Sequence, residues 1–153
     1  MVTFLRLLSS GFGAGYVPKI PGTVGSLWGL GLAYLFRYRS LDFKLLVAVI
    51  GVVLAILIAS MAEKVFEQKD CPKIVVDEII GQFIAFLFVP FALNTVIFGF
   101  VLFRYFDIAK YFPANWAQDR LPGGYGIVGD DVIAGLQAAL VLVFMNKIGI
   151  FIF

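Results

Sequence analysis

The carboxylates of this chain stand inside stretches that are otherwise apolar. Ten residues are acidic, and five of these interrupt such stretches. They are Asp77 and Glu78 in IVVDEIIG, Asp107 in LFRYFDIAK, and Asp130 and Asp131 in GIVGDDVIAG. A charge in an apolar surrounding costs roughly 2.5–3.5 kcal/mol on membrane-insertion scales. The fold must therefore gather the five acids around cations, and a hard divalent metal ion held by carboxylate oxygens is the natural solution.

Composition places the chain in or on a membrane. Hydrophobic residues make up 61% of the 153 positions, and the mean hydropathy is +0.99, well above ordinary soluble domains. This length predicts a single domain over residues 1–153. A net charge of only +2 gives no basic footprint, so we expect no nucleic-acid partner.

The residue types that are missing exclude several chemistries. The sequence has no histidine, which removes Ser-His-Asp and Cys-His catalysis and histidine-ligated zinc. The single Cys71 cannot form an internal disulfide. Position 77, where a cysteine phosphatase would need arginine, is aspartate. Any hydrolysis must therefore rest on carboxylates, lysine or metal-activated water.

Uncharged runs predict an all-α fold. Residues 45–62 form an uncharged run long enough for a membrane helix. A longer uncharged run, 79–103, contains Pro90 near its middle, and proline inside a helix breaks or kinks it. The predicted helices are 24–36, 45–62, 79–89, 91–108 and 132–153, with two glycine-rich loops at 11–26 and 113–131.

The two helices around Pro90 are short for a bilayer. Segments of about 11–17 residues extend roughly 17–25 Å, whereas the hydrocarbon core is about 30 Å thick. If both glycine-rich loops and all five acids share one site, the chain must leave that site and return to it within this segment. We therefore expect a re-entrant hairpin or a helical bundle partly sunk into one leaflet.

Two acidic motifs can be interpreted in two ways each. Asp77 and Glu78 can bind metal or act as a base, or they can be first-turn acids favoured by the helix dipole. Arg104, Asp107 and Lys110 share one broad helix face. They can form a simple ion-pair ladder, or Asp107 can bind metal while the basic residues hold phosphate.

Two glycine-rich motifs are similarly open. Asp130 and Asp131 follow GGYGIVG and open an apolar helix, as an N-cap with a first-turn acid or as metal ligands. Residues 21–26, PGTVGS, predict a helix start with Thr23 as its N-cap, and a helix N-terminus is a ready anion site. Together the acids, the cations and the glycine loops fit metal-assisted phosphoryl chemistry.

Three stretches, in this order, resemble the phosphatidylglycerophosphatase A family: GFGAGYVPKIPGTVGSLWG, KIVVDEIIGQF and FRYFDIAKYFPANWAQDRLPGGYGIVGDDVIAG. They cover most of residues 10–136 and are specific as a set. The resemblance implies a Mg²⁺-dependent enzyme of the bacterial inner membrane, with its active site on the cytoplasmic side. Its substrate would be phosphatidylglycerophosphate, from which it removes the terminal phosphate to give phosphatidylglycerol. The resemblance also implies a helical bundle with a central helix packed by others.

These expectations assign roles to particular residues. Asp77, Glu78, Asp107, Asp130 and Asp131 would hold Mg²⁺, with Asp77, Glu78 and Asp131 catalytic and Glu78 the candidate base for a metal-activated water. Phosphate or substrate binding would fall to Lys19, Gly22, Thr23, Ser26, Arg104, Lys110 and Arg120. The alternative is a small non-enzymatic transporter, since intramembrane acids and broken helices also occur in transporters.

Overall fold

The computed structural model describes residues 2–150, and every regular element in that part of the chain is helical. The all-α prediction is therefore confirmed. The elements in order are α1 (Val2–Ser9), the 3₁₀ turn η1 (Ala14–Tyr16), α2 (Pro21–Leu35), α3 (Leu41–Phe66), α4 (Val76–Ala85), α5 (Leu93–Ala109), α6 (Ala114–Arg120) and α7 (Gly124–Lys147).

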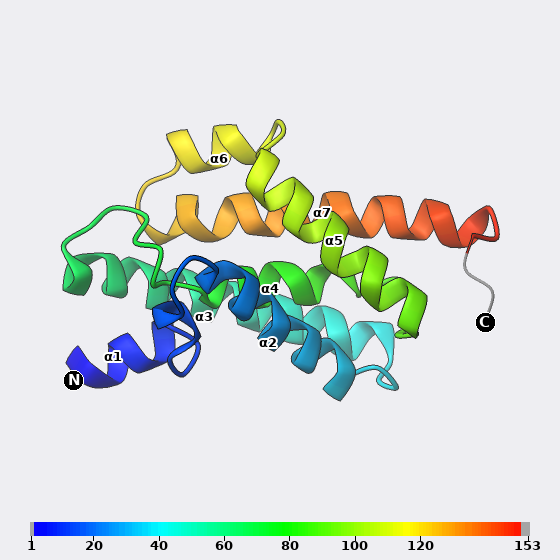
Figure 1. The fold of residues 1–153 in the computed structure, drawn as a ribbon, viewed down its shortest axis with the longest axis horizontal. Helices are drawn as coiled ribbons and strands as arrows, with labels where there is room; N and C mark the ends of the chain where they lie inside the picture. The colour runs from blue at the N-terminus through cyan, green and yellow to red at the C-terminus, as the bar shows by residue number, and fades with distance from the viewer. Residues whose placement is uncertain (1, 151–153) are drawn as a thin grey trace.

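The two longest helices, α3 and α7, run in opposite directions along the long axis of the molecule (Figure 1). Both are long and apolar enough to cross a membrane. Helix α3 contains the predicted run 45–62 and extends it at both ends. It begins after Ser40, whose side chain accepts a hydrogen bond from the Phe43 amide, and it ends at Glu67 in a left-handed conformation.

Helix α4 is the central helix that the sequence predicted. Seven of its ten residues are buried, and α2, α3, α5 and α7 all pack against it. Glycines allow the closest of these contacts. A Cβ atom on Gly135 of α7 would lie 2.3 Å from the Gly81 carbonyl oxygen, and one on Gly81 would lie 2.7 Å from that of Asp131. The backbones of α4 and α7 thus approach closely beside the acidic residues.

The break around Pro90 is also confirmed. Helix α4 ends at Ala85, and α5 begins at Leu93. The Thr95 hydroxyl accepts a hydrogen bond from the Ala92 amide and lies 2.6 Å from the Pro90 carbonyl oxygen. Backbone groups that lack helical partners are therefore satisfied locally, as an apolar setting requires.

The predicted loop 113–131 is wrong, because it contains α6 and the first turns of α7. Helix α7 begins at Gly124 rather than at residue 132, so Asp130 and Asp131 lie inside the helix and do not cap it. Glycines there serve packing: a Cβ atom on Gly124 would lie 2.3 Å from the Ile56 carbonyl oxygen. The predicted C-terminal helix ends at Lys147, and positions 151–153 lie outside the described residues. Helix α1 was not predicted.

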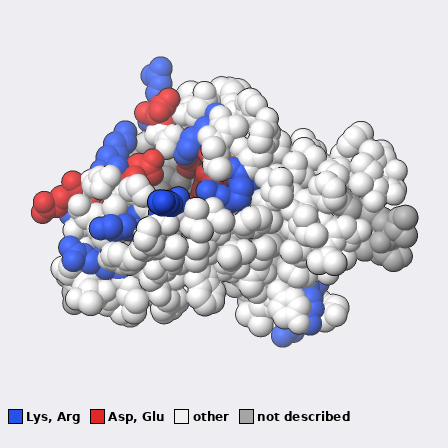
Figure 2. All heavy atoms as spheres, viewed as in Figure 1, with Lys and Arg blue, Asp and Glu red and all other residues white. Residues whose placement is uncertain are grey.

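Charged side chains gather at one end of the molecule. Figure 2 shows most red and blue atoms in the left part of the view, with a separate blue group at the lower right. The beginnings of α2, α4 and α7 and the end of α5 all point towards this polar end (Figure 1). The remaining surface is unusually apolar, with exposed residues such as Leu46, Val49 and Val53 along α3. Such a surface fits contact with lipid.

Candidate active site

Three carboxylates converge at the polar end. One oxygen from each of Asp77, Glu78 and Asp131 lies within 4.8 Å of the others, and we call this group the carboxylate nest. Asp77 and Asp131 are buried, with 7% and 3% of their surfaces exposed. Asp77 Oδ1 accepts a hydrogen bond from the Glu78 amide at 3.0 Å. By contrast, Glu78 Oε2 is buried without any hydrogen-bond partner among the described residues.

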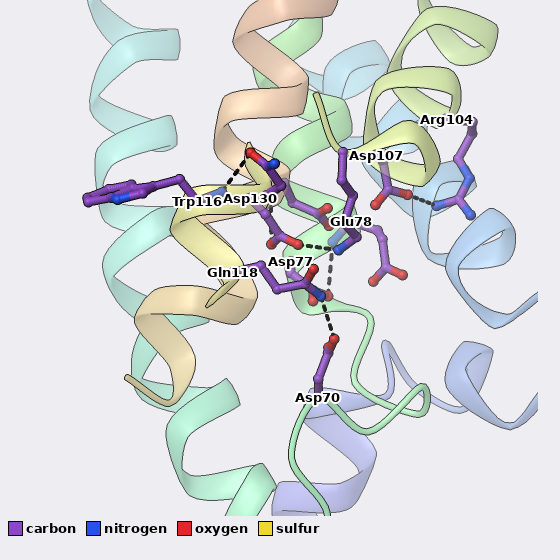
Figure 3. Close-up of polar contacts among 11 residues, drawn as sticks. Asp70, Asp77, Glu78, Arg104, Asp107, Trp116, Gln118 and Asp130 are labelled. Carbon is purple, nitrogen blue, oxygen red and sulfur yellow. Dashed lines mark hydrogen bonds and ion pairs between the residues drawn. The ribbon is translucent and has the colours of Figure 1, made fainter. Parts of the chain in front are cut away.

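The other two predicted ligands lie beside the nest but have basic partners. Asp107 forms an ion pair with Arg104 one turn earlier on α5, and Asp130 forms one with Lys110. Figure 3 shows the side chains of Asp77 and Glu78 from α4, Arg104 and Asp107 from α5, and Asp130 from α7 close to one another. Lys110 ends α5 in a left-handed conformation with φ 47°, which turns the chain at this point. The structure thus brings all five acids together. Within residues 2–150, three of them form no ion pair and two are paired.

Burial makes the ionised form of the nest unfavourable. It raises the pKa of Asp77 well above its usual value, and the neighbouring Glu78 and Asp130 raise it further. Burial is also the main reason that the pKa of Glu78 rises to about 8, with Asp131 and Asp107 adding to the effect. Burial alone would lower the pKa of Lys110, but its contact with Asp130 and the nearby acids raises it overall.

The start of α2 is pressed against this cluster. A Cβ atom on Gly22 would lie 2.2 Å from Glu78 Oε1 and 3.0 Å from Arg104 Nη1. Only glycine lets α2 approach so closely at this point. The prediction that Gly22 belongs to the site agrees with this position.

Four other predicted substrate-binding residues are placed differently. Thr23 is not the N-cap of α2, because that helix begins at Pro21 and Ile20 precedes it; proline is favoured at the first helical position. The buried Ser26 hydroxyl donates to the Gly22 carbonyl oxygen at 2.8 Å, so it is occupied within its own helix. Lys19 and Arg120 are exposed, and within residues 2–150 neither forms an ion pair with the five acids.

Two polar contacts near the cluster were not predicted from the sequence. Gln118 of α6 donates to Asp70 at 2.7 Å and so ties α6 to the segment before α4 (Figure 3). Gln137 of α7 donates to the Phe112 carbonyl oxygen at 3.2 Å and so holds the turn that follows Lys110. Gln118 lies in the predicted loop 113–131 and Phe112 directly precedes it, so both contacts depend on how this part of the chain folds.

Fold and site together define a helical protein with two candidate membrane helices and a recessed carboxylate cluster flanked by basic groups. Comparison with known proteins then identifies the family. The model of the phosphatidylglycerophosphatase A family matches residues 7–146. This chain belongs to that family, as the resemblance in the sequence predicted.

Individual relatives agree over most of their length. The phosphatidylglycerophosphatase A of Escherichia coli is 35% identical over 142 residues, which cover 92% of this chain and 83% of that protein. The protein of the same name from Haemophilus influenzae is 33% identical and covers 90% of this chain and 86% of its own length. A relative from Bacteroides thetaiotaomicron, provisionally named a phosphatidylinositol-3-phosphatase, is 32% identical over 89% of both chains. No solved structure matches the chain.

Proposed function

We propose that this chain is a Mg²⁺-dependent lipid phosphatase that hydrolyses the terminal phosphomonoester of phosphatidylglycerophosphate to phosphatidylglycerol and phosphate. The observation that carries the proposal is the carboxylate nest, with its unpartnered Glu78 oxygen, at the polar end of an apolar bundle. The choice of substrate is supported by the family and by the two relatives named phosphatidylglycerophosphatase A.

The chemistry of the nest fits magnesium. All of its donors are carboxylate oxygens, and hard oxygen donors suit Mg²⁺. The orphaned Glu78 oxygen lacks the partner that a buried polar atom needs. We assign Asp77, Glu78 and Asp131 as the principal ligands, with Asp107 and Asp130 beside them. When bound, the metal would polarise the phosphate and favour ionisation of an attacking water.

The chain's own residues then have distinct tasks. Glu78 would bind the metal through one carboxylate oxygen, and its second oxygen accepts the proton of the attacking water. The water oxygen bonds to phosphorus as the bond from phosphorus to the glycerol oxygen breaks. The glycerol oxygen takes up a proton from solvent, and Glu78 returns its proton to solvent. Arg104 and Lys110 hold the phosphate oxygens. Arg104 contacts Asp107 through one Nη atom, and its Nε has no partner among the described residues, so donors remain for phosphate while the ion pair is kept.

The same proposal places the protein in the bacterial inner membrane, with the polar end at the cytoplasmic head-group plane. The leaving group is a lipid glycerol oxygen, so the cluster has to lie near that plane. Basic residues stand around both ends of α3, so the positive-inside rule does not choose between the two orientations. At the far end of α2, Arg37 stacks on Tyr34 and Tyr38, which suits the opposite interface.

Phosphate release from purified protein in detergent tests this function. We expect hydrolysis of phosphatidylglycerophosphate with Mg²⁺, loss of activity in EDTA, and recovery when Mg²⁺ is restored. Phosphatidylinositol 3-phosphate serves as the comparison substrate, because one relative bears that specificity in its name. Full activity after exhaustive chelation would rule out the metal mechanism. Preference for the inositol lipid would overturn the substrate, and the absence of any phosphate release would favour the transporter.

A further inference from the structure

An apolar groove of about 590 Å³ lies between the first four helices. Its walls come from Leu8 and Phe12 near α1, Trp28 and Leu35 of α2, Ile58 of α3 and Ile79 of α4. None of its lining residues is charged, and the only side-chain hydroxyl among them belongs to Tyr34. A peptide or a charged ligand would leave its polar groups unpaired there, whereas a hydrocarbon chain has none to satisfy.

The groove begins beside the candidate site and leads away from the polar end. Ile79 follows Glu78 directly on α4, and Val76 precedes Asp77. Along α2, the groove residues Trp28 and Leu35 stand six and thirteen positions after Gly22. At 1.5 Å per residue they lie roughly 9 and 20 Å from the cluster along the helix axis. The groove therefore runs from the level of the carboxylates into the apolar part of the molecule.

Gly31, in the wall of this groove, has no other evident structural role. It lies inside α2, where glycine is less favourable than any residue except proline. A Cβ atom there would meet no heavy atom within 4 Å, and φ is not positive, so neither packing nor turn geometry requires glycine. Gly25 and Gly29 of the same helix, by contrast, meet Val75 and Ile79 at under 3 Å. Gly31 leaves a notch between Trp28 and Leu35, its neighbours one turn away.

We propose that this groove binds an acyl chain of the phospholipid substrate and that Gly31 keeps it open. The inference rests on the proposed function, since it seats the hydrophobic part of the lipid whose phosphate reaches the nest. Bulk lipid that merely surrounds the bundle would exchange without saturation, whereas a chain held in this groove occupies a discrete site.

Tryptophan fluorescence tests occupancy without relying on turnover. The sequence has two tryptophans, Trp28 in the groove and the exposed Trp116 on α6, which does not line it. In a Trp116→Phe background, phosphatidylglycerol with brominated acyl chains is titrated into the detergent-solubilised protein. We expect quenching of Trp28 that saturates and is reversed by unbrominated phosphatidylglycerol. In a Trp28→Phe background, Trp116 should show only a gradual response to the fraction of lipid in the micelle.

Variants at Gly31 link occupancy to substrate selection. Gly31→Leu should fill the notch and weaken saturable quenching about tenfold, equivalent to about 1.4 kcal/mol. For long-chain phosphatidylglycerophosphate, kcat/KM should fall about tenfold more than for a short-chain form, mainly through KM. The control is Leu27→Phe, which adds bulk to an exposed position of α2 outside the groove without adding a tryptophan, and which should change neither measurement.

The outcomes separate this inference from the proposed function. Linear quenching of Trp28 that Gly31→Leu leaves unchanged would mean surrounding lipid only and would overturn the groove. Equal loss on long-chain and short-chain substrates would do the same, because the variant would then act on the site itself. Absence of hydrolysis in the wild type, with saturable quenching intact, would refute the phosphatase and leave a lipid-binding groove.

Discussion

Gly22 offers the sharpest test of how the start of α2 shapes the carboxylate nest. In a Gly22→Ala variant the new Cβ atom would stand 2.2 Å from Glu78 Oε1. Ordinary contact begins near 3.4 Å, so the carboxylate must move by roughly 1 Å. The clashing atom is the end of a flexible side chain, and alanine favours the helix by up to about 1 kcal/mol over glycine. Global stability should therefore change little.

Activity should respond far more strongly than stability. A displacement of about 1 Å in a reacting group can reduce a rate by about a hundredfold, which corresponds to about 2.7 kcal/mol of barrier. We expect such a loss in kcat for phosphate release, together with weaker stabilisation by Mg²⁺, because Glu78 is an assigned ligand. Thermal unfolding and phosphate release are measured on the same preparation.

Gly51→Ala is the matched control. Its Cβ atom would stand 2.4 Å from Ile80 Cδ1, again the end of a flexible side chain on α4, but one that faces α3 rather than the nest. Gly51→Ala should keep wild-type activity within about twofold, a difference of about 0.4 kcal/mol in barrier. A Gly22→Ala protein with wild-type kcat and an unchanged Mg²⁺ response would refute the role given to Glu78 and to the start of α2.

Two further predictions concern the charges of the cluster. Asp131→Asn should abolish phosphate release and the stabilisation by Mg²⁺. In the wild type that stabilisation is about 2.7 kcal/mol at a hundredfold excess of Mg²⁺ over its Kd, and it is seen as a rise in melting temperature. The Asp131→Asn protein should still fold. The control is Asp119→Asn, at an exposed position of α6, which should keep both phosphate release and the Mg²⁺ response. If Asp131→Asn also keeps both, Asp131 does not belong to the site. Without metal, the raised pKa of Glu78 means that the folded state holds this proton more tightly than the unfolded state. The free energy of unfolding should therefore fall as pH rises from 4.5 towards about 8. Mg²⁺ should reduce this fall, and Glu78→Gln should flatten it. An unchanged slope in that variant would contradict the raised pKa assigned to Glu78.

Sequence reasoning worked where a strong local rule applied. The uncharged run 45–62 and the proline at position 90 fixed α3 and the α4–α5 break, because length and a missing amide donor act locally. It failed where glycine served packing. The glycines at 124 and 126 predicted a loop, yet both lie inside α7 where side chains would strike neighbouring backbone. The need for glycine at these two positions comes from the neighbouring helices α3 and α6, and the position of those helices cannot be predicted from a local sequence pattern.

The candidate site was predicted as a set of residues but not as an arrangement. The cost of isolated buried charge correctly brought Asp77, Glu78 and Asp131 together. The same argument could not show that Asp107 would pair with Arg104 and Asp130 with Lys110. The second pair depends on how α5 crosses α7. Lys19 and Arg120 were predicted as binding residues because they are basic, yet both are exposed and within residues 2–150 neither pairs with the acids, since charge alone does not determine position.

The division of the acids bears on how a phosphate could approach them. When all five acids are ionised, Arg104 and Lys110 balance two of the negative charges. Three negative charges then remain around one recessed point. A phosphomonoester, itself anionic, is repelled by that cluster, and each of its two natural partners, Arg104 and Lys110, already gives one N–H group to an aspartate. A divalent cation in the nest would offset two of the three charges and compete with the basic groups for Asp107 and Asp130. Cation binding and phosphate binding should therefore strengthen each other, because binding free energies at coupled sites are reciprocal.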